Sequence, residues 1–207
     1  MAMRYVYCSF RAIGAAITLK ETYLVIQNKS DKTDNPSPFM TRFLNGHMVL
    51  GLLFFITAMR LAVISISPLG PGVDEAQYWL WGQNLQFGYY SKPPLIAWLL
   101  GMVDAMFGQS AFTLRASGPI LHLFTSLILW QTGRLIAGDW CGRIAALLWL
   151  GLAAVGLGSV VVSTESVMLP FWAGALYCIF GSQQNPAIYA RYRAAAGRCE
   201  GVASLAK

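Results

Sequence analysis

The sequence predicts an all-α polytopic membrane protein with about four spans, on three observations. Of its 207 residues, 56% are hydrophobic and only 12% are charged, whereas a soluble domain carries about a quarter charged residues. Several apolar stretches approach the length of about 20 residues that crosses a bilayer. The basic residues stand at the ends of these stretches, as they do on the cytoplasmic side of membrane helices. They form no basic stripe with stacking aromatics, so the net charge of +6 does not indicate nucleic acid.

Residues 1–44 are predicted to be a cytoplasmic lead-in, partly flexible. Its apolar part, Tyr5–Leu19, is short and interrupted by Arg11, which argues against a signal peptide. Asn28–Arg42 is polar and contains two prolines, a composition typical of a linker.

Residues 45–182 are the predicted membrane region. Its four candidate spans share an apolar composition and near-bilayer length: His47–Ser67, Ala116–Ile136, Ile144–Val162 and the shorter Ser166–Ser182. The amino terminus is expected in the cytoplasm, because the lead-in is rich in Lys and Arg.

A fifth apolar segment, Pro93–Gly108, is short and carries Asp104. If it crossed the membrane, Arg134 and Arg143 would move to the outer side, against the positive-inside pattern. We therefore expect an interfacial helix on the outer face. Residues 68–115 then form one long external loop.

From Gln183 the composition changes to Ala, Arg and Gly without a further apolar stretch. Residues 183–207 are expected to form a divergent, disordered cytoplasmic tail. The chain as a whole is expected to be the amino-terminal part of a longer protein.

The external loop holds the charges that suggest chemistry. Asp74 and Glu75 follow the stiff Pro- and Gly-containing turn "SPLGPG", and Lys92 immediately precedes two prolines. Apolar and aromatic residues at helical spacing after Glu75 suit the bilayer interface, which would hold Asp74 near the headgroups. Solvated loop residues are the plain alternative.

A carboxylate beside a cation at this depth suggests glycosyl transfer from a lipid-phosphate sugar. A base takes the proton of the acceptor hydroxyl as it attacks the anomeric carbon. Positive charge stabilises the departing phosphate. One carboxylate is then essential, whereas a glycoside hydrolase needs two.

The segments "VDEAQYW", "GYYSKPPLIAWLL", "AFTLRASGP", "GRLIAGDWCGR" and "STESVMLPFWAGALY", in this order, resemble the bacterial GT-C membrane glycosyltransferases. These are relatives of protein O-mannosyltransferases, lipid A aminoarabinose transferases and Rgt-type galacturonosyltransferases. The resemblance covers about Arg60–Gly181 and implies a GT-C-type helical fold. Members have more spans and a carboxy-terminal soluble domain, so the resemblance suggests a truncated, amino-terminal part.

The resemblance also implies roles for individual residues. Asp74 matches the catalytic aspartate of the first external loop, and Lys92 matches the lysine that faces the donor phosphate. Glu75 completes the common Asp-Glu pair, and Glu165 stands where many relatives have an aspartate. Ser91 replaces a glutamate that often precedes the lysine.

Two arginines have two interpretations each. Arg60 lies toward the outer end of the first span and Arg115 at the outer end of the second. Either side chain reaches toward lipid headgroups or helps to bind a phosphate. We include Arg60 and Arg115, with Glu75, Lys92 and Glu165, among the candidate substrate-binding residues.

The resemblance implies a transferase of a bacterial inner membrane that uses a polyprenyl-phosphate-linked sugar as donor and a glycolipid or protein as acceptor. No cofactor and no metal ligand set is predicted, although a divalent metal stays open. The alternative is a catalytically inactive membrane fragment that at most binds lipid phosphate. A transporter half is disfavoured, because the sequence shows no internal repeat.

Overall fold

The computed structural model describes residues 45–68, 70–90, 92, 94–184 and 189–206. This part of the chain is helical and contains no strand. Its helices are α3 (Gly46–Ile66), α4 (Val73–Gly82), α5 (Leu95–Phe107), α6 (Ala111–Gly151), α7 (Ala153–Gly158), α8 (Thr164–Gln184) and α9 (Tyr189–Ser204). The lead-in predicted for residues 1–44 lies outside the described residues.

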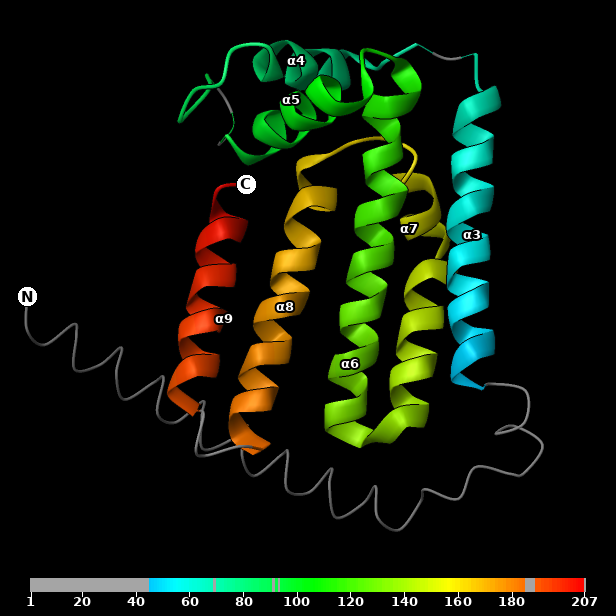
Figure 1. Ribbon diagram of the computed structural model, residues 1–207, viewed down its shortest axis with the longest axis vertical. Helices are drawn as coiled ribbons and strands as arrows, with labels where there is room; N and C mark the ends of the chain where they lie inside the picture. Colours follow the sequence, from blue (N-terminus) through cyan, green and yellow to red (C-terminus); the bar gives the residue numbers. More distant parts are fainter. Residues whose placement is uncertain (1–44, 69, 91, 93, 185–188, 207) are drawn as a thin grey trace, which may run out of the picture.

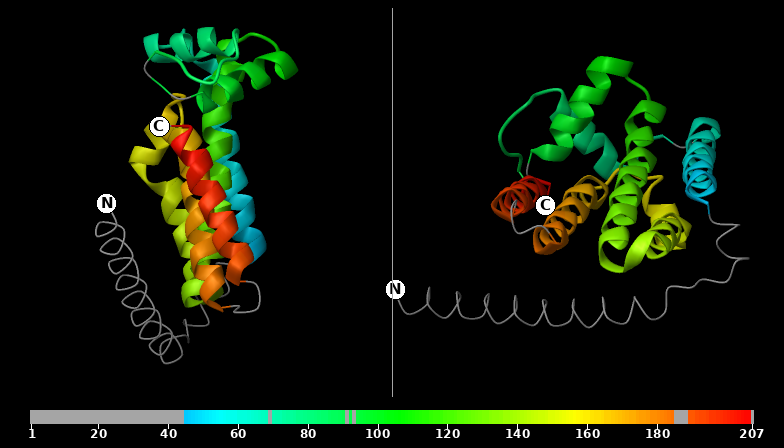
Figure 2. Two further views of the ribbon diagram at one scale, coloured as in Figure 1. Left: turned by 90° about the vertical axis from the view of Figure 1, so that its left-hand side faces the viewer. Right: turned by 60° about the horizontal axis from the view of Figure 1, so that its bottom comes forward.

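The long helices stand side by side as a bundle, and the two short helices of the predicted external loop lie across one end. Figures 1 and 2 show α3, both halves of α6, α8 and α9 in the bundle, with α4 and α5 over its end. The segment between α7 and α8 also reaches this end (Figure 1). Two stretches that are distant in sequence therefore meet at one end of the bundle.

Helix α6 is long enough to cross a membrane twice, and it folds back on itself. Its 41 residues would measure about 60 Å if straight, twice the apolar thickness of a bilayer. Ala137 and Gly138 break the helix, and Gly138 has a φ of 83°, which glycine adopts without strain. The two legs approach closely at Gly133, where an added Cβ would lie 2.6 Å from the Gly142 Cα. Asp139 pairs with Arg134 and Arg143 at this turn.

The structure supports a membrane protein. Helices α3 and α6 are long and apolar enough to cross a bilayer. Only 22% of the most apolar stretch of α3 is buried inside the molecule, so most of its apolar side chains face outward. Phe54, Phe55 and Met59 are among these exposed side chains, and exposed apolar surfaces of this kind mark contacts with a membrane or with another protein. The count of four spans stays a prediction.

Two apolar clusters hold the bundle together. One joins α3 to α6 through Val49, Leu53, Leu123, Trp130, Ala146 and Leu150. The other lies under α4 and α5, and its buried members are Tyr78, Ile96, Leu100, Leu114, Val162, Val167 and Ala206. The second cluster fixes the two short helices on the end of the bundle.

Helices α4 and α5 touch through glycines. An added Cβ at Gly101 would lie 2.6 Å from the carbonyl oxygen of Gly82, and one at Gly82 would lie 2.9 Å from the backbone nitrogen of Gly101. The absence of side chains lets the two backbones approach at this crossing.

The carboxy-terminal segment differs from the disordered tail expected from the sequence. Residues Tyr189–Ser204 form α9, which packs along α8, where Gly181 faces the ring of Tyr192. The Leu205 carbonyl accepts a hydrogen bond of 3.0 Å from the backbone N–H of Leu95 at the α4–α5 end. Ala-rich sequence has high helix propensity, and its small side chains allow close packing. Helical propensity and neighbouring surface therefore order a segment whose polarity suggested a tail.

Candidate active site

Helix α4 presents Asp74 at the end of the bundle. The turn Gly70–Gly72 leads into the helix, Gly72 is its N-cap, and Asp74 lies in the first turn. Asp74 is solvent-exposed. A carboxylate near a helix amino terminus is favoured by the free backbone N–H groups and by the helix dipole.

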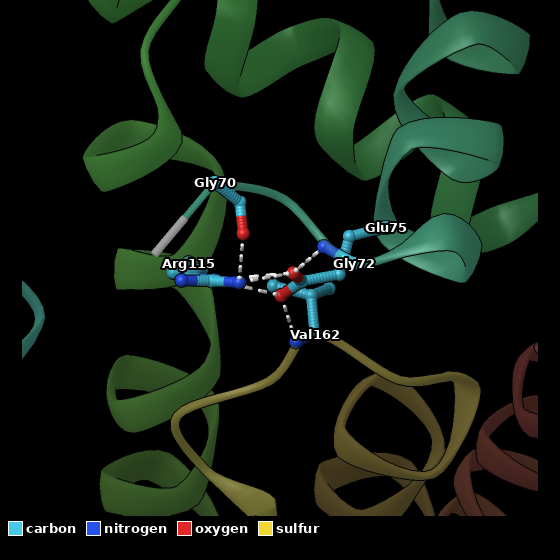
Figure 3. A network of polar contacts seen from close by, with 5 residues as sticks. All are labelled: Gly70, Gly72, Glu75, Arg115 and Val162. Carbon is cyan, nitrogen blue, oxygen red and sulfur yellow. Dashed lines mark hydrogen bonds and ion pairs between the residues drawn. The ribbon is translucent and has the colours of Figure 1, made fainter. Parts of the chain in front are cut away.

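Glu75, next to Asp74, is buried and paired with Arg115 of α6. The two side chains have relative exposures of 1% and 9%. The Arg115 Nη2 lies 2.7 Å from Glu75 Oε2, and its Nε lies 3.1 Å from both carboxylate oxygens. The backbone N–H groups of Gly72 and Val162 also donate to Glu75, at 2.8 and 3.1 Å (Figure 3).

This network connects three segments of the chain. Arg115 also donates to the Gly70 carbonyl at 2.8 Å, so the turn before α4 is fixed to the start of α6 (Figure 3). Val162 belongs to the segment between α7 and α8, and its N–H bond to Glu75 brings that segment to the same point. The network therefore sets the position of the first turn of α4, which carries Asp74.

The partners of Glu75 keep its side chain ionised. Burial raises the pKa of this carboxyl, but the hydrogen bonds from Arg115, Gly72 and Val162 outweigh burial and hold the pKa below its ordinary value. A fully partnered carboxylate of this kind is suited to positioning. Direct substrate contact by Glu75 or Arg115 stays a prediction.

Glu165 comes from a different part of the chain, the first turn of α8. Its pKa lies below the ordinary value, first because its own backbone N–H bonds the carboxylate, and further through the hydroxyls of Ser163 and Thr164 and the charge of Lys92. Glu165 is exposed and Lys92 is half-buried. The structure thus brings Lys92 within electrostatic range of Glu165, although 73 positions separate them in the sequence.

Tyr78 is a site residue that the sequence analysis did not identify. Burial raises the pKa of its hydroxyl, and the negative charges of Asp74 and Glu165 raise it further. The phenol therefore lies within electrostatic range of both carboxylates. Its position four residues after Asp74, on the same face of a helix, is the sequence signal that could have revealed it.

Arg60 lies away from this group. Its Nη2 donates at 2.6 Å to the carbonyl of Leu150, close to the end of α6. The last carbonyls of a helix lack partners within the helix, and a cation there also interacts favourably with the helix dipole. In this position Arg60 compensates the end of α6, and its predicted contact with a phosphate remains untested.

The described residues contain no group of three or more His, Cys, Asp or Glu side chains that could hold a metal ion together.

Comparison with known proteins identifies the family. Residues 91–207 match the sequence profile of the dolichyl-phosphate-mannose-protein mannosyltransferase family. The chain belongs to this family. The matched segment of this mannosyltransferase-family chain includes Lys92, Arg115 and Glu165, whereas Asp74 precedes it.

A curated relative supports the same assignment. Over 141 residues the chain is 36% identical to the lipid A galacturonosyltransferase RgtD of Rhizobium johnstonii. The alignment covers 67% of this chain and 30% of the relative, so the chain spans about a third of that protein. No solved structure matches the chain. The resemblance to GT-C-type glycosyltransferases inferred from the sequence is confirmed.

Proposed function

We propose that this chain carries the donor-facing part of a membrane glycosyltransferase, which moves a sugar from a polyprenyl-phosphate donor to an acceptor at the outer face of a bacterial inner membrane. The observation that carries the proposal is that Tyr78 lies within electrostatic range of Asp74 and Glu165, and Lys92 within range of Glu165. The helices that carry these residues meet at the α4–α5 end of the bundle (Figure 1). In this proposal Asp74 is the base and Lys92 the cation, and both stand at the depth of a lipid headgroup.

The reaction needs one bond to form and one to break. An acceptor hydroxyl oxygen attacks the anomeric carbon, and the bond from that carbon to the phosphate oxygen breaks. Asp74 takes the hydroxyl proton, and the electron pair of the broken bond leaves with the polyprenyl phosphate. Lys92 stabilises the negative charge that develops on this phosphate. Glu165 and Tyr78 line the same site and orient the acceptor or the ammonium.

The acceptor is proposed from the relatives. The name of the galacturonosyltransferase from Rhizobium gives lipid A as its acceptor, whereas the family description names protein. The relative aligns over more of this chain than the family profile does. A glycolipid acceptor is therefore favoured.

A test uses the full chain in lipid nanodiscs with a polyprenyl-phosphate sugar and a lipid A acceptor. We expect release of polyprenyl phosphate by the natural chain and its loss in Asp74→Asn, because the amide cannot accept the proton. Equal thermal stability of the two proteins shows that the change acts on chemistry. Undiminished transfer by Asp74→Asn would refute the role of Asp74 as the base.

A second candidate function is the binding of lipid phosphate by a membrane protein without turnover. It is considered because the alignment covers only 30% of the relative. Binding of a polyprenyl phosphate without transfer, in the same nanodisc assay, distinguishes it. Lys92→Ala is expected to weaken that binding, whereas Asp74→Asn leaves the phosphate contact intact.

A further inference from the structure

Tyr89 fastens the segment between α4 and α5 to the end of α4. Its hydroxyl lies 2.9 Å from the carbonyl oxygen of Trp81 and 2.8 Å from that of Asn84. The single O–H can donate to either of these two carbonyls. It also accepts a hydrogen bond of 3.1 Å from the backbone N–H of Gln86. One phenol thus links the last turn of α4 to the residues that follow it.

The ring of Tyr89 makes a second contact with α4. It stacks on the indole of Trp81 with ring centroids 5.0 Å apart and planes inclined by 14°. Stacked aromatic pairs contribute beyond the area that they bury. The Tyr89 side chain is half-buried and is fixed at both its hydroxyl and its face.

The backbone of Tyr89 leads directly to Lys92. Its N–H donates a hydrogen bond of 3.2 Å to the Lys92 carbonyl, which closes a short turn. A lysine side chain is a flexible stem of four carbons, so the position of its ammonium depends on where its backbone is held. In this structure that backbone is attached to Tyr89, and Tyr89 is attached to α4.

We propose that Tyr89 is a positioning residue: it holds the backbone of Lys92 against the end of α4, so that the ammonium stands where a lipid-linked phosphate binds. The inference rests on the proposed function in one respect, the phosphate as the ligand of Lys92. Tyr89 itself acts through Lys92.

The neighbouring tyrosine supplies a matched control. Tyr90 carries the same hydroxyl one position later, and its side chain is fully exposed. Tyr89→Phe removes the hydroxyl that reaches the Trp81 and Asn84 carbonyls but keeps the stacking ring. Tyr90→Phe removes a hydroxyl of equal size from the surface.

The first measurement is the rate at which an N-hydroxysuccinimide ester acylates Lys92 in the full chain in detergent, followed by mass spectrometry of the Lys92 peptide. We expect several-fold faster acylation in Tyr89→Phe, because the turn is released, and the natural rate in Tyr90→Phe. Equal rates in Tyr89→Phe and the natural chain would overturn the proposal, whether or not the chain binds phosphate.

The second measurement is the affinity for a short-chain polyprenyl monophosphate. Tyr89→Phe should weaken it about tenfold, as the loss of hydrogen bonds worth about 1.4 kcal/mol predicts. In a Lys92→Ala background the same change should cost about twofold or less, because Tyr89 acts through the lysine. An undiminished loss in that background would show a general structural role and contradict positioning. If the natural chain does not bind this lipid, the proposed function fails, and the acylation rates alone decide the role of Tyr89.

Discussion

Two neighbouring carboxylates of α4 have different environments in this structure. Asp74 is exposed at the site, whereas Glu75 is buried against Arg115 and accepts hydrogen bonds from Gly72 and Val162. Consecutive residues of a helix point about 100° apart, so one faces the solvent and the other faces the bundle. The Asp-Glu pair thus combines one exposed carboxylate, the proposed base, with one buried carboxylate that positions the helix.

This division predicts very unequal effects of two conservative substitutions on stability. Glu75→Gln should lower the free energy of unfolding by about 3–5 kcal/mol, because it leaves the buried Arg115 charge without its carboxylate counter-ion. Asp74→Asn, at the exposed neighbour, should change stability by less than about 0.5 kcal/mol. Thermal unfolding of the detergent-solubilised chains measures both, and equal stability of Glu75→Gln and the natural chain would contradict the buried-pair account.

The same pair predicts an acid sensitivity. The folded-state pKa of Glu75 lies below its ordinary value of about 4.3, so the pair contributes fully above that pH. The contribution is lost as the pH falls through the lower, folded-state pKa. The difference in melting temperature between the natural chain and Glu75→Gln should therefore be constant from pH 7 to about pH 5 and shrink in more acidic buffer. A difference in melting temperature that grows on acidification would contradict a lowered pKa of Glu75.

At the scale of elements, the site depends on how closely α4 and α5 cross. Asp74 comes from α4, and Lys92 comes from the segment that leads into α5. The two helices meet at Gly82 and Gly101, where there is no room for a side chain. The crossing therefore sets the distance between the proposed base and the proposed cation.

Gly101→Ala tests this crossing. The new methyl group would lie 2.6 Å from the Gly82 carbonyl oxygen, so the helices must separate. Overpacking of this kind costs about 1–3 kcal/mol. We expect weaker binding of polyprenyl phosphate and a lower melting temperature.

Gly51→Ala is the matched control, because an added Cβ at this position of α3 meets no atom within 4 Å. It should leave binding unchanged and preserve or slightly raise stability. If both alanine variants behave alike, the α4–α5 crossing does not position the site.

At the scale of the whole molecule, the fold places the carboxy-terminal segment differently from the sequence-based expectation. The sequence predicted a cytoplasmic tail after Gln183, whereas α9 runs back along α8 to the α4–α5 end (Figure 1). Helix α9 carries Arg191, Arg193 and Arg198, and charges are costly at mid-membrane depth. The two arrangements put the end of α9 on opposite sides of the membrane.

Cysteine labelling in cells distinguishes them. In a cysteine-free background, Val73→Cys should react with a membrane-impermeant maleimide in intact cells, and Asn45→Cys only after permeabilisation, because the two positions lie at opposite ends of α3 and its following turn. Ser204→Cys should label like Val73→Cys if α9 crosses with the bundle. Labelling of Ser204→Cys together with Asn45→Cys would show that α9 does not follow the bundle in the membrane, and reversal of the first two would invert the proposed orientation.

Composition and apolar length by themselves determined that this chain is a helical membrane protein, because the bilayer requires about 20 apolar residues per span and basic residues at the cytoplasmic ends. The ordered motifs likewise predicted the family, which the profile match confirms. These properties follow from the order and composition of the residues along the chain, without knowledge of which segments meet in space.

Only the tertiary structure decided which charges meet. Three pairs join segments that are distant along the chain: Glu75 with Arg115, Lys92 with Glu165, and Tyr78 with Glu165. The contacts of Tyr89 with the end of α4 likewise depend on hydrogen bonds. The reversal of α6 at Gly138 depends on backbone angles. Electrostatic and hydrogen-bonding energies depend on the separation of groups in space. That separation is set by how the helices pack, and the pattern of hydropathy along the sequence does not specify the packing.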